Sequence, residues 1–556
     1  MPLADLKAGQ HGEVWTVFRG TKPEPFAVQV TGVVRNALGP GKSVILCELT
    51  DPRVQNMGAV AGMSGSPLYI DGKLAGALSY QVQRFETVRY AGFTPAADMG
   101  EVADRVGAAA SMESSPIEAP PAEASTLSYR PLKPVFTLGG LSPAVAELMA
   151  PHLAALGLNV SALGGSTQGS GAGSASIGTG ALHPGDAVSV ALATGDITLA
   201  GTGTVSSVTG NRIIAFGHPM LGLGDVQLPI CATEVVTILP STLESTKVAN
   251  VGQVIGSITQ DRLSAVSGTL GAGPEMIDVD VSVAQVGAEP RKLRFQVARQ
   301  QQLTPVLIAT GLSQALLGSN DAGLSNGFRL NSDVTFSPSQ ELAAKSVYAG
   351  PQAFMQGLNE FVQGLAAELQ NPYEKTFPNR VSFTVEPLEE NPAVTVDLFQ
   401  ISRSSVRGGE WIQATLAWRD FQGDPHTQSL DIPISQGWAG KRLEVIAAPG
   451  RMLDELTGRP RTVPPAQLRS FDAYLKAVRQ GRPADGICVA VVEKSALFTD
   501  QTAATPEAPA SIARIAHAAD EDRFQQRDAL LPLWETHMLS GKVATAVVRR
   551  ALQVVD

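Results

Sequence analysis

The chain has 556 residues, of which 44% are hydrophobic and 17% are charged, a composition typical of folded rather than disordered proteins. Its length predicts about three or four domains. The formal net charge of −10 and the lack of a basic run argue against a general nucleic-acid binder, which needs clustered Lys and Arg. Three cysteines stand far apart with no CxxC pair, which argues against a structural zinc site and a disulfide framework.

Strand patterns fill the N-terminal region from residue 12 to 105. The segments "FAVQVTGVV" and "SVILCEL" are rich in β-branched residues, and "IDGKLAGALSY" carries an Asp-Gly turn signal between two apolar runs. Residues 111–128 are rich in Pro, Ala, Ser and Glu and have no apolar period, as is typical of linkers. We therefore expect a β-rich lobe followed by a linker.

A second β-rich region follows this linker. A short helix is predicted at 143–156, with Ser142 as its N-cap and Pro143 at its first position. The Gly- and Ser-rich stretch 164–176 cannot pack a core and is expected to form a loop. Residues 180–300 return to strand patterns, with repeated Gly-Asp and Thr-Gly turns.

The pattern changes beyond residue 300. Apolar residues recur at three- and four-residue steps between 351 and 370, which predicts an amphipathic helix. In 411–418 apolar residues alternate with Gln and Thr, which predicts a half-buried strand of a β-sandwich. A second helix is predicted at 466–479, and 502–511 is expected to be flexible. No run of 18 apolar residues occurs, so no transmembrane helix is expected.

These patterns predict a mainly β protein that divides into six parts. The parts are a β-rich lobe at 1–110, a linker at 111–135, a second lobe at 136–300, a mixed or helical segment at 301–380, a β-sandwich-like domain with a helix at 381–500, and a flexible or helical tail at 501–556.

A Gly-rich turn, Gly62-Met63-Ser64-Gly65-Ser66-Pro67, holds a candidate nucleophile. A catalytic serine needs a neighbouring base and N–H donors for the developing oxyanion. Gly62 and Gly65 permit unusual backbone angles, so the N–H groups of Gly62 and Ser64 could converge on one point as an oxyanion hole. Chymotrypsin uses the same spacing. Ser66 does not match the register of a nucleophile and is expected to be a turn residue.

This turn resembles the Gly-Asp-Ser-Gly-Gly-Pro of trypsin-like serine peptidases. It resembles more closely the Gly-Met-Ser-Gly-Ser-Pro of the bacterial sporulation factor IV B peptidases, the S55 serine peptidase family. Residues Ile214–Pro219 are similar to that family's Gly-His-Pro motif, and 252–271 also resembles its sequences. The chain departs from the sporulation peptidases because Ser64 precedes His218, an order that resembles a permuted, usually exported subset, and because no PDZ segment is found.

The resemblance implies that His218 is the base. An imidazole with an unperturbed pKa near ~6.5 can take and return a proton near neutral pH. The other six histidines, His152 among them, lack such a context and are expected at the surface or at caps. The acid stays open: Asp261 is the first candidate and could instead pair with Arg262 or cap a turn, Asp225 is the second, and a dyad without an acid is the third.

The sequence and the resemblance together imply a serine endopeptidase with a two-lobed, trypsin-like β-barrel unit, a C-terminal helical segment and a β-sandwich-like domain. It would cleave protein or peptide substrates through an acyl-enzyme, with no metal and no cofactor, and self-processing at the linker is a further expectation. The resemblance also implies export to the periplasm or outside the cell, with the signal peptide absent from this chain.

Two alternatives remain. A non-catalytic binding or envelope scaffold could keep the peptidase fold without activity. An esterase is disfavoured because the Gly-x-Ser-x-Gly elbow would need Gly at Ser66 and no βαβ pattern is present.

Overall fold

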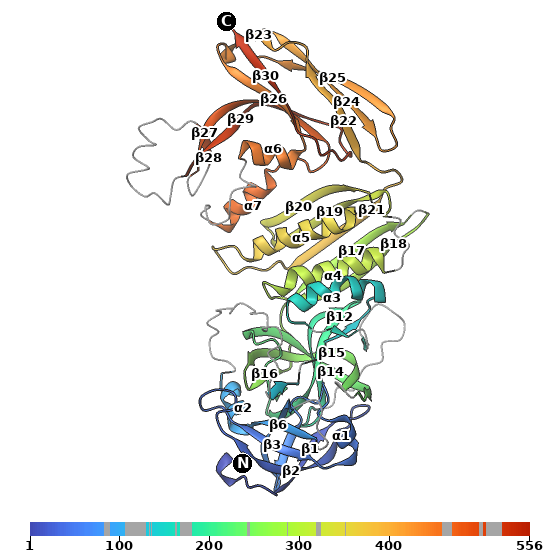
Figure 1. The fold of residues 1–556 in the computed structure, drawn as a ribbon, viewed down its shortest axis with the longest axis vertical. Coiled ribbons are helices and arrows are strands. Elements are labelled where there is room, and N and C mark those ends of the chain that lie inside the picture. The colour runs from blue at the N-terminus through green and yellow to red at the C-terminus, as the bar shows by residue number, and fades with distance from the viewer. Residues whose placement is uncertain are drawn as a thin grey trace, which may run out of the picture. The chain divides into compact units, whose positions relative to one another are not determined.

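A computed structural model of the chain shows a protein built mostly from strands (Figure 1). It describes residues 1–82, 89–105, 129–132, 134, 136–158, 160–161, 164–166, 181–241, 245–285, 287–318, 324–350, 352–458, 470–499, 504–506 and 525–556. Strands account for 52% and helices for 18%, which confirms the mainly β prediction.

The chain forms two compact units. The first comprises Met1–Val279 and Leu293–Gly318, and the second Asp280–Lys292 and Ser319–Asp556. Two paired strands, β17 (Met276–Gln285) and β18 (Ala288–Ala298), contribute to both units. All the residues of the serine and histidine motifs lie in the first unit.

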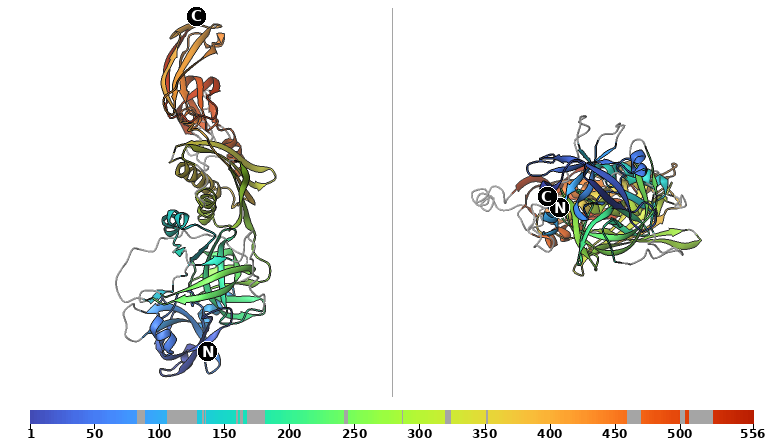
Figure 2. Two further views of the ribbon diagram at one scale, coloured as in Figure 1. Left: turned by 90° about the vertical axis from the view of Figure 1, so that its right-hand side faces the viewer. Right: turned by 90° about the horizontal axis from the view of Figure 1, so that it is seen from below.

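A closed six-stranded antiparallel barrel forms the N-terminal part of the first unit, blue in Figures 1 and 2. Its strands are β1 (His11–Thr16), β2 (Glu24–Val34), β3 (Val44–Leu49), β4 (Pro67–Ile70), β5 (Lys73–Val82) and β6 (Tyr90–Pro95), in the order β4-β1-β2-β3-β6-β5, and β4 pairs with β5 to close the ring. Inward-facing apolar residues such as Val28, Val30 and Phe93 fill its core. Helices α1 (Pro52–Met57) and α2 (Ala96–Ala103) and the short η1 (Leu3–Asp5) complete it.

A second closed six-stranded antiparallel barrel follows. Its strands are β11 (Ala187–Gly195), β12 (Thr198–Thr209), β13 (Arg212–Ala215), β14 (Gly224–Leu239), β15 (Thr246–Arg262) and β16 (Ala265–Leu270), in the order β11-β14-β15-β16-β13-β12, closed by the pairing of β11 with β12. Two closed barrels in one unit agree with the two-lobed, trypsin-like architecture expected from the motifs.

Shorter elements extend these barrels. Strands β8 (Phe136–Gly139), β9 (Val160–Ser161) and β10 (Gly165–Ser166) join the second barrel's sheet, and β7 (Tyr129–Pro131) pairs with β5 of the first. The strand β7 falls inside the segment 111–135 expected to be a linker, most of which lies outside the described residues.

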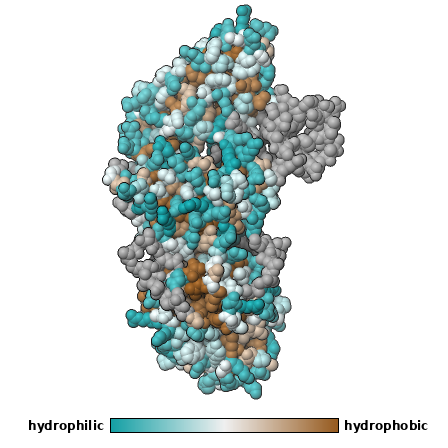
Figure 3. Space-filling view, turned by 180° about the vertical axis from the view of Figure 1, so that it is seen from behind, coloured by the Kyte–Doolittle hydropathy of each residue, from teal (hydrophilic) through white to brown (hydrophobic). Residues whose placement is uncertain are grey.

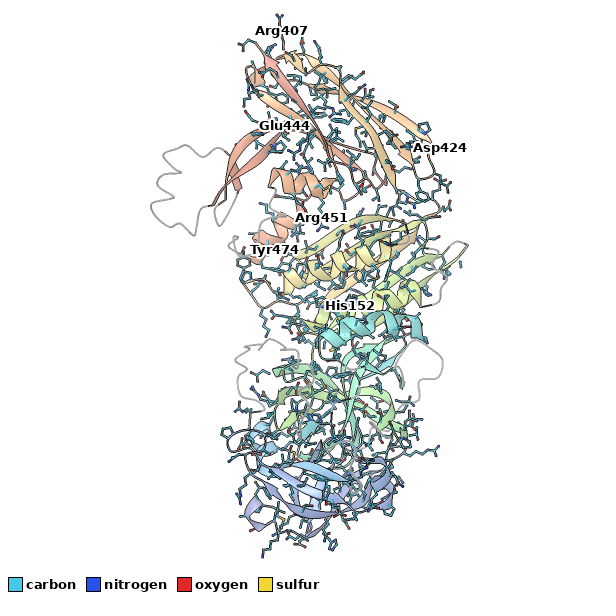
Figure 4. All side chains as sticks on the ribbon, viewed as in Figure 1. His152, Arg407, Asp424, Glu444, Arg451 and Tyr474 are labelled. Atoms are coloured by element: carbon cyan, nitrogen blue, oxygen red, sulfur yellow. The ribbon has the colours of Figure 1, made fainter. Side chains whose placement is uncertain are left out.

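Two helices of the first unit lie side by side (Figures 1 and 2). They are α3 (Pro143–Ala155) and α4 (Leu303–Leu317). The helix α3 confirms the predicted start, because the Ser142 hydroxyl accepts a hydrogen bond from the N–H of Val145. His152, in the last turn of α3, is exposed as predicted (Figure 4).

The second unit begins with a four-stranded arrangement and the predicted amphipathic helix. Strands β19 (Gly327–Ser337), β20 (Gln340–Ala349) and β21 (Arg380–Pro387) run in the order β20-β19-β21-β17, and α5 (Ala353–Leu369) packs against β19 and β20. The chain then forms a sheet of β22 (Val394–Ile401), β24 (Trp411–Asp420) and β25 (Pro425–Pro433).

A further sheet shares one apolar core with that three-stranded sheet, as in a β-sandwich. It contains β23 (Ser405–Arg407), β26 (Arg442–Ala448), β27 (Ile487–Thr499), β28 (Ala504–Pro506), β29 (Gln525–Met538) and β30 (Val548–Val555). Two of its strands lie between residues 525 and 555, so the expectation of a flexible or helical tail at 501–556 is wrong for those residues. The remaining elements are η2 (Gln436–Trp438), α6 (Gly450–Thr457) and α7 (Phe471–Arg479). In the second unit Arg451 of α6 forms an ion pair with Glu360 of α5 at 3.1 Å (Figure 4).

The surface carries apolar residues among mostly polar ones (Figure 3). In the first unit the exposed large apolar side chains include Val236, Leu239 and Val254, on the paired strands β14 and β15. Among the helices that the structure describes, none is both long and apolar enough to cross a membrane.

Candidate active site

The serine turn connects α1 with β4 and depends on two glycines. Gly62 and Gly65 have φ of +96° and +94°, a region that side chains disfavour. A Cβ on Gly65 would overlap the carbonyl oxygen of Thr204 and the backbone nitrogen of Phe216. The motif therefore needs glycine at 65 because two segments of the second barrel approach its backbone directly.

Backbone hydrogen bonds hold the turn on β5. The N–H of Gly65 donates to the carbonyl of Leu78 at 2.7 Å, and the N–H of Leu78 donates to the carbonyl of Ser66 at 2.9 Å. The hydroxyl of Ser66 donates to the carbonyl of Met63 at 2.6 Å. Ser66 thus closes its own turn, as its register indicated.

Strand β12 of the second barrel binds the other side of the same turn. The N–H of Thr204 donates to the carbonyl of Ser64 at 2.8 Å, and its hydroxyl donates to the carbonyl of Gly62 at 3.2 Å. The hydroxyl of Ser206 donates to the carbonyl of Gly65 at 2.8 Å. The candidate nucleophile therefore lies at the junction of the two barrels.

The histidine motif follows β13 and reaches the same junction. Phe216 and Gly217 have φ of +68° and +67°, which turns the chain sharply before His218. The Thr94 hydroxyl, on β6 of the first barrel, lies 2.5 Å from the carbonyl of Gly217 and 2.9 Å from the hydroxyl of Ser79. A Cβ on Gly217 would overlap that Ser79 hydroxyl. The histidine loop is thus held against the first barrel.

The His218 ring is buried and has one hydrogen-bonded nitrogen. Its Nδ1 lies 2.7 Å from the carbonyl oxygen of Pro219. Because a carbonyl can only accept, Nδ1 carries the proton in the neutral ring and Nε2 is left with its lone pair. Burial lowers the pKa of His218 to about 4, opposed by the backbone carbonyls of Pro219 and Leu132. The ring is therefore neutral at pH 7, in the tautomer that a general base needs.

Two reactive atoms at this junction lack hydrogen-bond partners. The Ser64 Oγ and the His218 Nε2 are both buried, and neither has a partner among the described residues. No hydrogen bond joins them in this conformation. Unsatisfied buried polar atoms are uncommon in folded proteins, and a catalytic role is one of the reasons for which they occur.

The candidate oxyanion donors are also free. The backbone N–H groups of Gly62 and Ser64 have no acceptor in the part of the chain that the structure describes. Neighbouring N–H groups of the turn, those of Met63 and Gly65, donate to carbonyls instead. Two free donors two residues apart beside a serine are the chemistry that stabilises an oxyanion.

The structure gives Asp261 a different role from the acid of a triad. Its carboxylate, 1% exposed, accepts hydrogen bonds from the N–H groups of Met220, Leu221, Gly222 and Leu223 at 2.7–3.3 Å. Burial raises the pKa of Asp261, and these four hydrogen bonds oppose the rise. The carboxylate therefore holds the loop after His218, in line with the turn-capping alternative.

The second candidate acid is occupied elsewhere. The carboxylate of Asp225 forms an ion pair with Arg262 at 2.7 Å. The His218 ring is therefore hydrogen bonded to the carbonyl of Pro219, with neither candidate carboxylate on its Nδ1.

A buried lysine beside the turn was missed by the sequence analysis. Lys247, at the start of β15, is 1% exposed, and its Nζ donates to the hydroxyl of Thr16 at 2.8 Å. Burial lowers the pKa of Lys247 to about 7. The period-two pattern could have found it, because Lys247 alternates with the buried Ala249 and Val251 on one face of the strand.

The fold and the site define a two-barrel, mainly β protein of the trypsin-like class, with a serine turn and a histidine loop at the barrel junction. Residues 3–93 match the family model described as SpoIVB peptidase S55, which supports the resemblance that the serine motif indicated. The match includes Ser64 and ends before His218. No curated protein and no solved structure matches the chain. The family match supports a peptidase function for the protein.

Proposed function

We propose that the protein is a serine endopeptidase that cleaves protein substrates through an acyl-enzyme on Ser64. The observation that carries this proposal is the junction itself. The serine turn and the histidine loop both reach this junction, and it holds the buried, unpartnered Ser64 Oγ and His218 Nε2 together with the free N–H groups of Gly62 and Ser64. The family match to the serine segment supports the same reaction class.

Each group has a defined role in this reaction. Ser64 Oγ attacks the substrate carbonyl and gives its proton to His218 Nε2, while the N–H groups of Gly62 and Ser64 hold the oxyanion. The imidazolium then protonates the leaving amine, and water hydrolyses the acyl-enzyme with His218 as base. The carbonyl of Pro219 fixes the tautomer in place of a carboxylate, and Asp261 is a positioning residue for the histidine loop.

The site is closed in this conformation. Ser64 and His218 are both 0% exposed, so a substrate reaches them only after a covering segment moves. The proposed enzyme is therefore latent as it stands. Export to the periplasm or beyond and self-processing within 111–128 are parts of the same proposal that rest on the resemblance, and that segment lies outside the described residues.

The second candidate is a non-catalytic scaffold with the peptidase fold. The observation that favours it is the pairing of both candidate carboxylates with groups other than His218. The two functions differ in whether Ser64 reacts as an activated nucleophile.

Intact-mass measurement after exposure to a fluorophosphonate separates the two. We expect one adduct on the wild type and none on Ser64→Ala or His218→Ala. The variants His152→Ala and Ser429→Ala, both at exposed residues remote in sequence from the two motifs, serve as matched controls and should be labelled like the wild type. A folded wild type that gains no adduct after prolonged exposure would favour the scaffold.

A further inference from the structure

A short segment of the chain lies along β5 as an added strand. Strand β7 (Tyr129–Pro131) pairs antiparallel with β5, with Pro131 opposite Tyr80 and Tyr129 opposite Val82. The next residue continues the pairing, because the N–H of Leu132 donates to the carbonyl of Ser79 at 2.8 Å. Four residues are thus held by their backbone on the strand that also carries the serine turn.

The side chain at the end of this segment is buried at the first barrel. Leu132 is 2% exposed and belongs to the same apolar cluster as Met63 and Leu78. Met63 immediately precedes Ser64, and the carbonyl of Leu78 holds Gly65. The leucine side chain therefore lies among the residues that support the serine turn.

The carbonyl of the same leucine faces the candidate base. The backbone carbonyl of Leu132, like that of Pro219, raises the pKa of His218 against the effect of burial, and His218 Nε2 has no hydrogen-bond partner among the described residues. Ser79, whose carbonyl binds Leu132, also contacts Thr94, which binds the carbonyl of Gly217. The backbone of Leu132 thus lies close to β5, which holds the serine turn, and to the loop that carries His218.

An extended backbone paired with a strand, a side chain in an apolar pocket and a carbonyl beside the base are the features of a peptide bound to a peptidase. We propose that Tyr129–Leu132 occupies, within its own chain, the groove in which the substrate binds. The enzyme then takes extended peptides along β5 with a bulky aliphatic side chain, such as leucine, in the position of Leu132. This inference rests on the proposed peptidase function and names its substrate class.

The proposal accounts for the closed site. A segment of the same chain acts at an effective concentration of the order of mM, so a substrate in solution must compete with it or wait for it to leave. Ser64 and His218 are fully buried while the segment is bound. The alternative is that Tyr129–Leu132 is a permanent strand of the barrel, with no part in binding.

The first test is the rate of fluorophosphonate labelling of Ser64 in the wild type, Leu132→Ala and Leu138→Ala. The control Leu138 is 4% exposed, on β8. We expect labelling of Leu132→Ala to be faster than wild type by roughly 10-fold or more, as for a binding-competent state that is a minor population in the wild type. Leu138→Ala should stay near the wild-type rate. Equal rates for Leu132→Ala and the wild type would overturn the proposal.

The second test needs no substitution. A peptide boronate, acetyl-Tyr-Arg-Pro-boroLeu, is added to the wild type, and hydrogen–deuterium exchange is followed in peptides that contain residues 129–132. We expect hydrogen–deuterium exchange in residues 129–132 to become faster when the boronate is bound. An analogue that carries an aspartate side chain in place of the leucine side chain should bind at least about 10-fold more weakly. Binding with unchanged exchange identifies a permanent strand and overturns the inference.

The two proposals fail differently. If neither fluorophosphonate nor boronate modifies Ser64 in any folded variant, the peptidase function itself is wrong. Ser64 could instead be modified while Leu132→Ala leaves the labelling rate unchanged and the boronate leaves the exchange of residues 129–132 unchanged. In that case only the proposed occupancy of the groove is wrong.

Discussion

The stem of Lys247 lies against Gly62, two residues before Ser64: a Cβ on Gly62 would come within 2.9 Å of the Lys247 Cβ. The backbones are joined as well, since the N–H of Lys247 donates to the carbonyl of Ala61 at 2.9 Å. A buried lysine whose Nζ binds only the Thr16 hydroxyl, among the described residues, thus supports the candidate oxyanion hole.

Lys247→Met should stabilise the protein at low pH. In the folded state the pKa of Lys247 falls to about 7 from its ordinary 10.5, so between these values the unfolded chain binds more protons. Wild-type stability should therefore rise as the pH goes from 7 to 10.5, and the full cost of burying the charge is present below 7. At pH 6 we expect the variant to gain a few kcal/mol, with about 5 kcal/mol as an upper figure from the size of the pKa shift.

Chemical denaturation at pH 6 and pH 9.5 measures this difference. The exposed Lys345→Met is the control and should follow the pH dependence of the wild type. An advantage of Lys247→Met that is the same at both pH values would show that the charge is not the cause.

Gly65→Ala should destabilise the barrel junction severely. The new Cβ would overlap backbone atoms of Thr204 and Phe216 at a φ of +94°, so the second barrel must move away from the serine turn. We expect a loss of about 3 kcal/mol or more in thermal or chemical unfolding, together with loss of Ser64 labelling. Gly72→Ala has a similar φ of +72° but open space around the Cβ and should cost only about 1 kcal/mol.

Asp261→Asn should weaken the reaction moderately. The substitution replaces an acceptor of four backbone N–H groups that shape the loop after His218, without touching the ring. We expect the labelling rate of Ser64 to fall by roughly 10-fold with its pH profile unchanged, whereas loss of a true triad acid costs about 10⁴-fold. The matched control Asp225→Asn, which breaks only a partly exposed ion pair with Arg262, should stay within about twofold of the wild type.

The fall of the Ser64 labelling rate at low pH should occur at a lower pH than for an ordinary histidine. The pKa of the buried His218 lies at about 4 instead of 6.5, so the base stays neutral as the pH falls through 6. We expect the rate of Ser64 labelling to stay constant as the pH falls to about 5. The rate should then fall as the His218 ring takes up a proton near pH 4. A midpoint near 6.5 would show that His218 is solvated in the reactive state.

The lowered pKa of His218 should also make the free energy of unfolding decrease as the pH falls. Between pH 6.5 and 4 the unfolded chain protonates His218 and the folded chain does not, so the wild type should lose stability as the pH falls through this window. His218→Gln should reduce that loss, as measured by denaturation at pH 7 and pH 5. An identical loss in wild type and variant would place the effect on other groups.

The sequence predicted the parts of this site that depend on local pattern. Gly62, Ser64 and Gly65 carry a turn whose backbone requirements can be read from residue types, and alternating apolar residues predicted the strands that form both barrels. The N-cap Ser142 predicted the helix α3, and the three- and four-residue spacing of apolar residues predicted the helix α5.

The features of the site that depend on contacts between distant parts of the chain could not be predicted from the sequence. The sequence offered Asp261 as a candidate acid for His218. Only the folded loop shows that its carboxylate accepts hydrogen bonds from the N–H groups of Met220–Leu223. The three-residue strand β7 is too short to have a period, and it was included in a linker. Lys247 was passed over because an isolated lysine normally lies at the surface.

The mass of an acyl group on Ser64 tests the proposed peptidase function most directly. Wild type and Leu132→Ala are mixed with a p-nitrophenyl ester of acetyl-leucine, quenched in acid and digested, and the peptide that contains Ser64 is sequenced by tandem mass spectrometry. We predict the acetyl-leucyl mass on Ser64, with a matching burst of p-nitrophenol, and neither signal in Ser64→Ala or His218→Ala. Folded protein that shows no acyl group on Ser64 in either form would contradict the proposed peptidase function.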